Sequence, residues 1–156
     1  MLERAREGEE GAARAFRLED HLFFDFSQIL ARRTRALNAS LRPYGLDYTR
    51  WRVLAVLNEY SGATMGRLAD LTSVDRTTLT RTLGLMEKAG LVVRRERESD
   101  RRSLAISLTA KGRRMFARIL PLALSETARA LTGFSSAEIG ILRDRLKRMA
   151  DNLRAS

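Results

Sequence analysis

Cysteine is absent from this chain of 156 residues, and histidine occurs once, as His21. The lack of cysteine excludes a disulfide framework, a thiolate metal site and a cysteine redox switch. A single histidine excludes a histidine cluster and a zinc triad. No uninterrupted apolar run approaches the ~20 residues of a membrane helix, and the first residues contain acids and no apolar signal segment. We therefore expect a protein of the cytoplasm, without a metal, a cofactor or a membrane partner.

Motifs that carry catalysis are missing as well. The sequence has no glycine-rich phosphate loop and no nucleophile-elbow motif. An apolar fraction of 44% is ordinary for a globular protein, and the length suffices for one domain with a core or for a small domain with an assembly interface. We expect no catalytic residues, and a protein that binds a partner rather than an enzyme.

What the sequence has in excess is positive charge. The formal net charge is +10 and the isoelectric point is about 11.2, which indicates a polyanionic partner. Apart from Lys88, Lys111 and Lys147, every basic residue is arginine. Codon usage in a GC-rich genome explains this bias as well as function does, although guanidinium groups suit phosphate and guanine better than ammonium groups do. The basic residues are concentrated between Leu91 and Arg118.

Helical periodicity marks the beginning of the chain. Apolar residues recur at helical spacing from about Phe16 to Leu41, and Pro43 and Gly45 then interrupt the pattern. We expect one long helix there, preceded by a disordered tail over residues 1–15. Asp47 is placed to N-cap the next helix, with a hydrophobic staple formed by Leu46 and Trp51.

Two shorter helices with a tight connection are expected over residues 65–72 and 75–89. Ser73 is a good N-cap residue for the second of them, Asp75 in its first turn suits the helix dipole, and Gly90 is placed as its C-cap. The following apolar residues can form a shared core: Leu68, Leu71, Val74, Leu79, Leu83 and Met86. The remaining side chains then point elsewhere, namely Arg76, Thr77, Thr78, Thr80 and Arg81. This pattern is typical of a helix-turn-helix whose second helix enters the major groove of DNA.

The segment RRERESDRRSLAISLT, residues 94–109, combines a charge run with alternating apolar residues. Together with the apolar run that precedes it, the segment predicts a β-hairpin with a basic tip. A hairpin directly after a recognition helix is a wing, and arginine at its tip can enter the narrow, electronegative minor groove. The alternation therefore seats the strand on the core, while the charged tip contacts DNA.

The last third of the sequence predicts two helices. Thr109 caps a long helix through about Phe134, in which Pro121 should introduce a kink or a division. Ser135 and Glu138 form a capping box for the final helix. Its apolar residues follow a 3-4 spacing, namely Ile139, Leu142, Leu146, Met149 and Leu153. Packing within the chain would explain this seam, but amphipathic helices on both sides of a compact middle favour a shared dimer layer.

On these segments the chain resembles the MarR family, the multiple antibiotic resistance regulators. The matching segments are LDYTRWRVLAVL, MGRLADLTSVDRTTLTRTLGLMEKAGLVVR, DRRSLAISLTAKG and the long final helices, so the likeness extends from about Leu18 onward. The resemblance implies a homodimer with a winged helix-turn-helix in each subunit, bound to an inverted-repeat operator and released by small aromatic or phenolic ligands. It also implies that the arginine of the wing motif, Arg102, enters the minor groove while Asp100 steers the wing. The absence of cysteine excludes the thiol-sensing branch of the family.

These observations lead to one set of expectations. The fold is mainly α with a small β-hairpin wing: a winged helix-turn-helix over residues 47–112 and dimerisation helices over residues 16–46 and 113–154. The expected function is that of a sequence-specific DNA-binding transcriptional regulator, a repressor; an architectural DNA-binding protein without an effector is the alternative. The expected DNA contacts are Ser73, Asp75, Arg76, Thr77, Thr78, Thr80, Arg81, Arg97, Asp100, Arg101 and Arg102. The aromatic candidates for an effector pocket are His21, Phe24 and Trp51.

Overall fold

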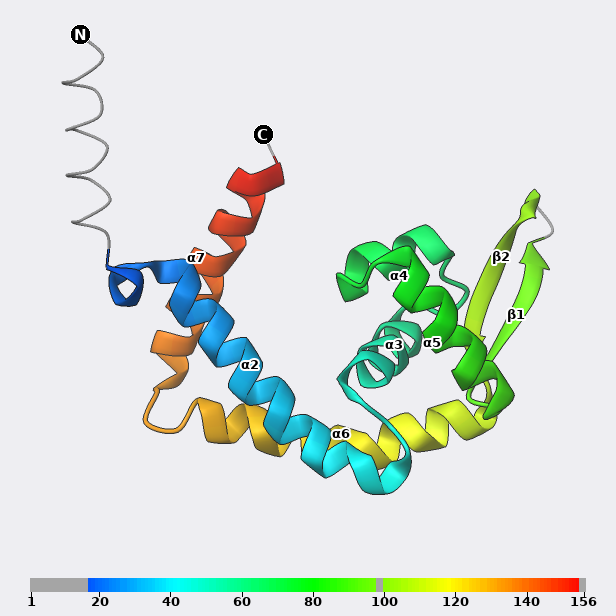
Figure 1. The fold of residues 1–156 in the computed structure, drawn as a ribbon, viewed down its shortest axis with the longest axis horizontal. Coiled ribbons are helices and arrows are strands. Elements are labelled where there is room, and N and C mark those ends of the chain that lie inside the picture. Colours follow the sequence, from blue (N-terminus) through cyan, green and yellow to red (C-terminus); the bar gives the residue numbers. More distant parts are fainter. Residues whose placement is uncertain (1–16, 98–99, 155–156) are drawn as a thin grey trace, which may run out of the picture.

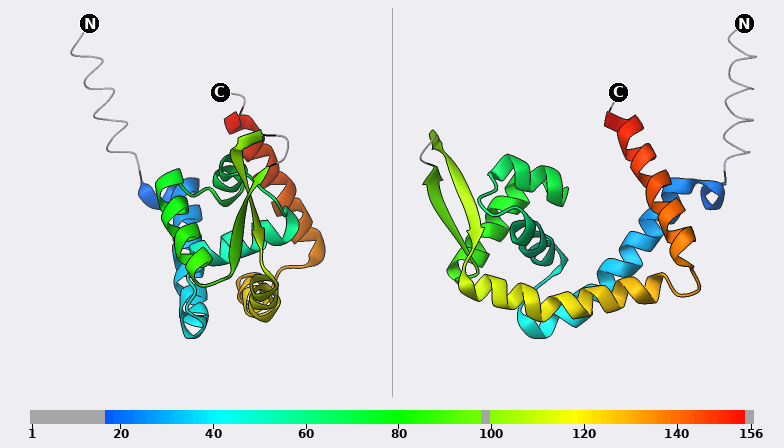
Figure 2. Two further views of the ribbon diagram at one scale, coloured as in Figure 1. Left: turned by 90° about the vertical axis from the view of Figure 1, so that its right-hand side faces the viewer. Right: turned by 180° about the vertical axis from the view of Figure 1, so that it is seen from behind.

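A computed structural model describes residues 17–97 and 100–154, without the side chains of residues 97 and 100–103. Figure 1 shows two parts joined by one long helix: a winged unit with a β-hairpin at one end, and an arm of two helices at the other. Helix α6 runs along the base of both parts, as the right-hand view of Figure 2 also shows. The expected tail, residues 1–15, lies outside the described residues. None of the described helices is long and apolar enough to cross a membrane.

The arm begins with a short 3-10 turn, η1 (Leu18–Asp20), followed by helix α2 (Leu22–Leu41). The expectation of one continuous helix from Phe16 is wrong for the described part, because His21 has an extended backbone between the two segments (φ −90°, ψ 111°). The end of the helix is confirmed. A 3-10 turn, η2 (Arg42–Tyr44), follows at once and closes on Gly45, whose φ of 67° is left-handed.

Helix α3 (Tyr48–Glu59) forms the centre of the winged unit. Its N-cap is Asp47, whose carboxylate accepts a hydrogen bond of 2.8 Å from the backbone N–H of Arg50, as the sequence predicts. The helix buries Trp51, Val53, Leu54 and Leu57. It contacts α6, α4 (Met65–Thr72) and the hairpin, so it positions every other element of the unit.

The turn between α4 and the next helix, α5 (Arg76–Lys88), differs from the expectation. Ser73 is not an N-cap: its backbone is left-handed (φ 49°) and it ends α4. Asp75 takes the capping role, because it directly precedes the first helical residue and its carboxylate accepts a 2.8 Å hydrogen bond from the N–H of Thr78. The end of α5 before Gly90 (φ 69°) is confirmed.

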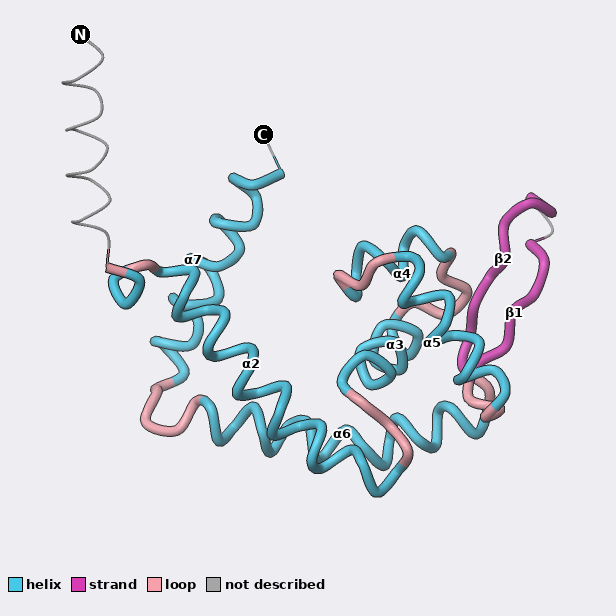
Figure 3. Tube along the Cα trace, in the orientation of Figure 1, coloured by secondary structure: helices cyan, strands magenta, loops and turns pink. Residues whose placement is uncertain are grey.

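Strands β1 (Val92–Arg97) and β2 (Asp100–Leu108) form the antiparallel hairpin, the two-stranded sheet of Figure 3. The register pairs Val92 with Leu108 and Arg94 with Ile106. Val92, Ile106 and Leu108 are buried on the core side, whereas Leu104, nearer the tip, is 43% exposed. The core therefore holds only the root of the hairpin.

Helix α6 (Ala110–Ala130) starts against the root of the hairpin. A Cβ atom on Gly112 would clash with the carbonyl oxygen of Leu91, so only glycine allows this close approach. Pro121 does not divide the helix, which follows a shallow arc in Figure 2. The helix ends at Ala130 rather than near Phe134.

Helix α7 (Ser136–Arg154) completes the arm, and it buries none of its residues. The predicted capping box is confirmed: the carboxylate of Glu138 accepts a 2.8 Å hydrogen bond from the N–H of Ser135, and the Ser135 hydroxyl accepts one from the N–H of Glu138. The hydrophobic core instead joins the winged unit to one end of α2 (Leu37, Leu41) and to the middle of α6 (Ile119, Ala123).

Candidate nucleic-acid interface

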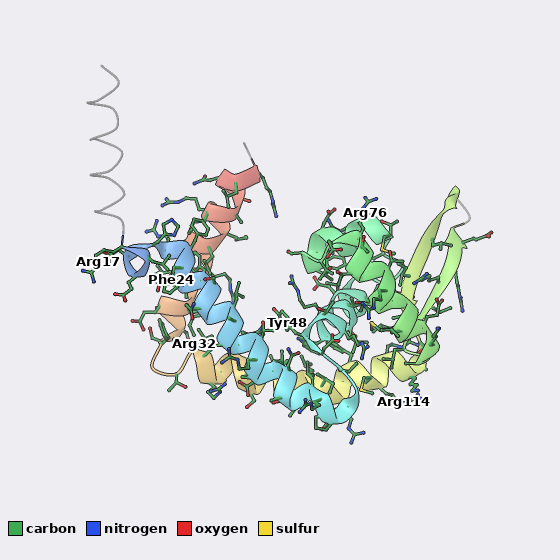
Figure 4. The ribbon with its side chains drawn as sticks, in the orientation of Figure 1. Arg17, Phe24, Arg32, Tyr48, Arg76 and Arg114 are labelled. Carbon is green, nitrogen blue, oxygen red and sulfur yellow. The ribbon has the colours of Figure 1, made fainter. Side chains whose placement is uncertain are left out.

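Helix α5 presents a polar face to solvent and buries the opposite one. Leu79, Leu83 and Met86 are buried in the core. The predicted contact residues are all exposed: Arg76, Thr77, Thr78, Thr80 and Arg81. Figure 4 shows Arg76 at the edge of the winged unit that faces away from α6. An exposed row of arginine and threonine can hydrogen-bond to base edges and contact thymine methyl groups.

Two of the expected contact residues, Asp75 and Thr80, form hydrogen bonds within the protein. The hydrogen bond from the Thr78 N–H lowers the pKa of Asp75, which keeps this carboxylate ionised and engaged as the helix cap. The hydroxyl of Thr80 donates to the carbonyl oxygen of Arg76 at 2.7 Å. Ser73 is exposed in the left-handed turn before α5.

The first turn of α4 adds one residue that sequence reasoning missed, Arg67. Arg67 stacks over the ring of Tyr60 at 5.3 Å, and the guanidinium of Arg76 lies above Gly66, 3.6 Å from the position that a Cβ atom there would take. Arg67 and Arg76 therefore flank the N-terminal turn of α4, where free N–H groups and the helix dipole favour a phosphate. A basic residue in the first turn of the first motif helix was the available sequence signal.

The hairpin projects on the same side of the winged unit as the exposed end of α5 (Figures 1 and 2). Strand β1 ends at Arg97 and β2 begins at Asp100, and the register pairs these two residues. The side chains of Arg97, Asp100, Arg101 and Arg102 lie outside the described part of the structure. Their assignment to DNA contact stays a prediction from sequence.

The arrangement of a helix-turn-helix followed by a wing is also found in known proteins. Residues 44–103 match the model of the MarR family. The transcriptional repressor IacR of Pseudomonas putida is 26% identical over 140 residues, which cover 90% of this chain and 81% of IacR. The crystal structure of a MarR-family transcriptional regulator from Silicibacter pomeroyi superposes with a TM-score of 0.81 at 27% identity, over 90% of this chain and 94% of that one.

Over residues 44–103 the chain has the winged helix-turn-helix of the MarR family. It is a DNA-binding transcriptional regulator with the winged helix-turn-helix fold, and such regulators are not enzymes. The structure of CouR from Rhodococcus jostii RHA1, bound to p-coumaroyl-CoA, is a further similar structure, with a TM-score of 0.78 and 27% identity over 87% of this chain and 96% of CouR. Within the described residues of the chain, no group of three or more histidine, cysteine or acidic side chains could hold a metal ion.

The three aromatic candidates for an effector site are not brought together within one chain. Trp51 is 8% exposed, and its ring stacks on Phe116 with centroids 5.5 Å apart. His21 precedes α2 and contacts the ring of Phe23 at 6.0 Å. Figure 4 places Phe24 near the far end of the arm, away from Tyr48 at the start of α3. The packing of Trp51 against α6 makes it part of the core.

A basic aromatic cluster lies instead where α2 meets α3. Arg33 of α2 and Arg52 of α3 both stack over the ring of Tyr48, at 5.7 and 5.6 Å, and Arg33 donates a 3.3 Å hydrogen bond to the Tyr48 hydroxyl. All three side chains are half-buried. Among the described residues neither arginine forms a salt bridge, so two partly desolvated cations share one aromatic ring without a counter-ion. We call this set the Tyr48 cluster.

A cavity of about 330 Å³ lies beside the Tyr48 cluster, between α2 and α6. It is lined by Ile29, Arg32, Arg33, Glu126, Arg129 and Ala130. The guanidinium of Arg129 forms a salt bridge of 2.6 Å with the carboxylate of Glu126. Arg32 and Arg33 therefore give the cavity an excess of positive charge. The combination of an apolar wall and uncompensated guanidinium groups suits an organic anion.

Proposed function

We propose that the chain is a cytoplasmic repressor that binds an inverted-repeat operator as a homodimer and leaves it when a small aromatic anion binds. The observation that carries the DNA part is the exposed row of arginine and threonine on α5, on the same side of the winged unit as the hairpin. In this arrangement α5 enters the major groove and the wing enters the adjacent minor groove. The similarity to the repressor IacR supports the regulatory outcome.

A second copy of the chain is the proposed partner of the arm. Large apolar side chains of α2 and α7 are 40% or more exposed, namely Leu22, Phe23, Ile29, Leu30, Ile141, Leu142, Leu146 and Leu153. A monomer rarely leaves so many apolar residues in water on one part of its surface. Residues 16–46 and 113–154 would then form the dimer layer, and two winged units related by a two-fold axis fit an inverted repeat.

Binding to the protein's own promoter region, compared with random duplex DNA at equal salt, tests this function. A sequence-specific regulator should bind its operator at least ~10³-fold more tightly than random DNA. An architectural DNA-binding protein, the second candidate, would bind both with similar affinity because phosphate contacts carry no sequence information. The exposed threonine row favours the regulator, because threonine contributes base contacts and no positive charge.

The Tyr48 cluster supports an anionic aromatic effector. The carboxylate of an aromatic acid would supply the missing negative charge to Arg33 and Arg52. Its ring would pack against the tyrosine ring and the apolar wall of the cavity. CouR, whose structure holds p-coumaroyl-CoA, supports an aromatic acyl ligand in a similar fold. Such a ligand would act only through different affinities for the DNA-competent and DNA-incompetent spacings of the two α5 helices.

A panel of aromatic carboxylates, each paired with its neutral amide, tests the effector class by release of labelled promoter DNA. We expect the carboxylates to release DNA at lower concentrations than the amides, and we expect Arg33→Gln and Arg52→Gln to remove this difference. Arg35→Gln, an exposed position on the same helix, should leave it unchanged. Equal release by acids and amides, or by none of them, would contradict an anionic effector at this cluster.

A further inference from the structure

One side of the hairpin contains a charged residue in an otherwise apolar row. Directly opposed residues of an antiparallel pair lie on the same face, so Val92, Arg94, Ile106 and Leu108 share the side that packs on the core. Val92, Ile106 and Leu108 are 4% exposed or less. Arg94 occupies the next position toward the tip, with its side chain 25% exposed. An apolar residue would complete this row without the cost of desolvating a charge.

The head of Arg94 reaches the last turn of α5. Its Nε atom lies 3.5 Å from the Oε2 atom of Glu87, and both Nε and Nη2 are buried without a hydrogen-bond partner. A partly buried ion pair with unmade hydrogen bonds adds little stability, but it links β1 to the last turn of α5. A cation at the C-terminal turn of α5 also suits the helix dipole.

This contact is the outermost polar link between the described hairpin and the helices. The root is fixed by Thr109, whose hydroxyl donates to the carbonyl oxygen of Gly90 at 2.6 Å. On the other strand, Ile106, which pairs with Arg94, forms a backbone bridge to Ala63. Beyond Arg94, the described side chains of Glu96 and Leu104 are exposed. A small change of angle at Arg94 therefore becomes a larger displacement at the tip.

We infer that Arg94 is a positioning residue for the wing: through Glu87 it fixes the angle between β1 and α5. The consequence for DNA rests on the proposed function, in which α5 contacts the major groove and the tip contacts the minor groove. A fixed angle sets the number of base pairs between the two contacts. Recognition of the flanking sequence thereby depends on a residue that touches no DNA.

Spin-label distances report how the hairpin is placed relative to the helix-turn-helix, and the labels can be introduced singly because the chain contains no native cysteine. Labels at Leu104→Cys on β2 and Asp70→Cys on α4 use two exposed positions, and excess unlabelled chain restricts the signal to distances within one protomer. The unchanged chain should give a narrow distance distribution. Arg94→Met, which completes the apolar row, and Glu87→Gln, which keeps the shape of the side chain, should both broaden it.

Arg95→Met is the matched control, since Arg95 is an exposed arginine next to Arg94 on the same strand. It removes the same charge from the other face of the hairpin and should leave the distribution narrow. The exchanged pair, Arg94→Glu with Glu87→Arg, should restore a narrow distribution. Wild-type distributions in both Arg94→Met and Glu87→Gln would overturn the inference, as would equal broadening by Arg95→Met.

Selection of bound sites from random DNA gives the second measurement. Arg94→Met should keep the preference at the half-site contacted by α5 and lose the preference at flanking positions, with its melting temperature maintained. An Arg94→Met selection identical to that of the unchanged chain would contradict the positioning role. Absence of any flank preference in the unchanged chain would contradict the proposed wing contact, and the distance measurement would still decide the role of Arg94.

Discussion

Arg81 lies on the exposed face of α5, on the opposite side from the buried residues Leu79 and Leu83. If it hydrogen-bonds to a base edge, Arg81→Ala should weaken operator binding by about 1–3 kcal/mol and relax the preference at particular operator positions. Arg114→Ala removes the same charge from α6, on the other side of the winged unit (Figure 4), and should not change the site preference. Equilibrium binding to single-base operator variants measures both effects. Equal weakening on every variant would assign Arg81 to a phosphate.

The wing residues lead to a prediction with a definite sign. Arg102→Ala should weaken binding most on operators with A·T-rich flanks, because arginine favours the narrow minor groove of such sequences. Arg101→Ala should weaken all sites alike and lower the salt slope by about one unit. Asp100→Ala should resemble Arg102→Ala, although it removes a negative charge beside DNA. Tighter binding by the Asp100 variant, with flank preference retained, would show that net charge alone matters there.

Which residues could be predicted from the sequence depended on how local their interactions are. The caps at Asp47 and at Ser135 with Glu138 involve neighbours within three residues, and the sequence predicts both. The prediction of Ser73 as the N-cap of α5 is wrong, because Ser73 ends α4 in a left-handed turn and Asp75 caps α5 instead. Two good capping residues so close together leave the sequence ambiguous. The Tyr48 cluster and the Arg94–Glu87 pair join different elements, so no local pattern indicates them.

At the scale of elements, apolar periodicity predicted the order of helices and strands, whereas the ends depended on backbone geometry. Pro121 was expected to divide or kink α6, yet the helix continues to Ala130 along a shallow arc. Ile119 and Ala123 on both sides of the proline are buried against the core. Their packing offsets the lost hydrogen bond that a proline imposes on a helix interior.

The proposed role of helix α7 in the dimer can be tested directly. Leu142 and Leu146 are about two-fifths exposed, and α7 buries no residue in the single chain. Leu142→Glu with Leu146→Glu should therefore convert a dimer into monomers or unfolded chains, because both charges would be placed in the proposed apolar interface. Lys147→Glu, a charge change on the same helix away from the apolar seam, is the control. A light-scattering mass that shows an undisturbed dimer for the leucine variant would refute the assignment.

At the scale of the whole molecule, the absence of cysteine limits how binding can be regulated. Mild peroxide should not release the operator by disulfide chemistry, since no thiol is present to be oxidised. Binding followed by fluorescence anisotropy, with peroxide and then with a thiol reductant, measures this. Release of the operator by peroxide, followed by recovery of binding when the reductant is added, would contradict this prediction.

The central claim is that two winged units in one dimer recognise an inverted repeat. Selection of bound sites from random DNA tests it most directly, because the operator sequence emerges from the selection itself. We predict enrichment of two identical half-sites in inverted orientation, with centres separated by about one helical turn or a multiple of it, roughly 10 bp each. Enrichment of a single half-site, of direct repeats, or of no motif at all would contradict the account.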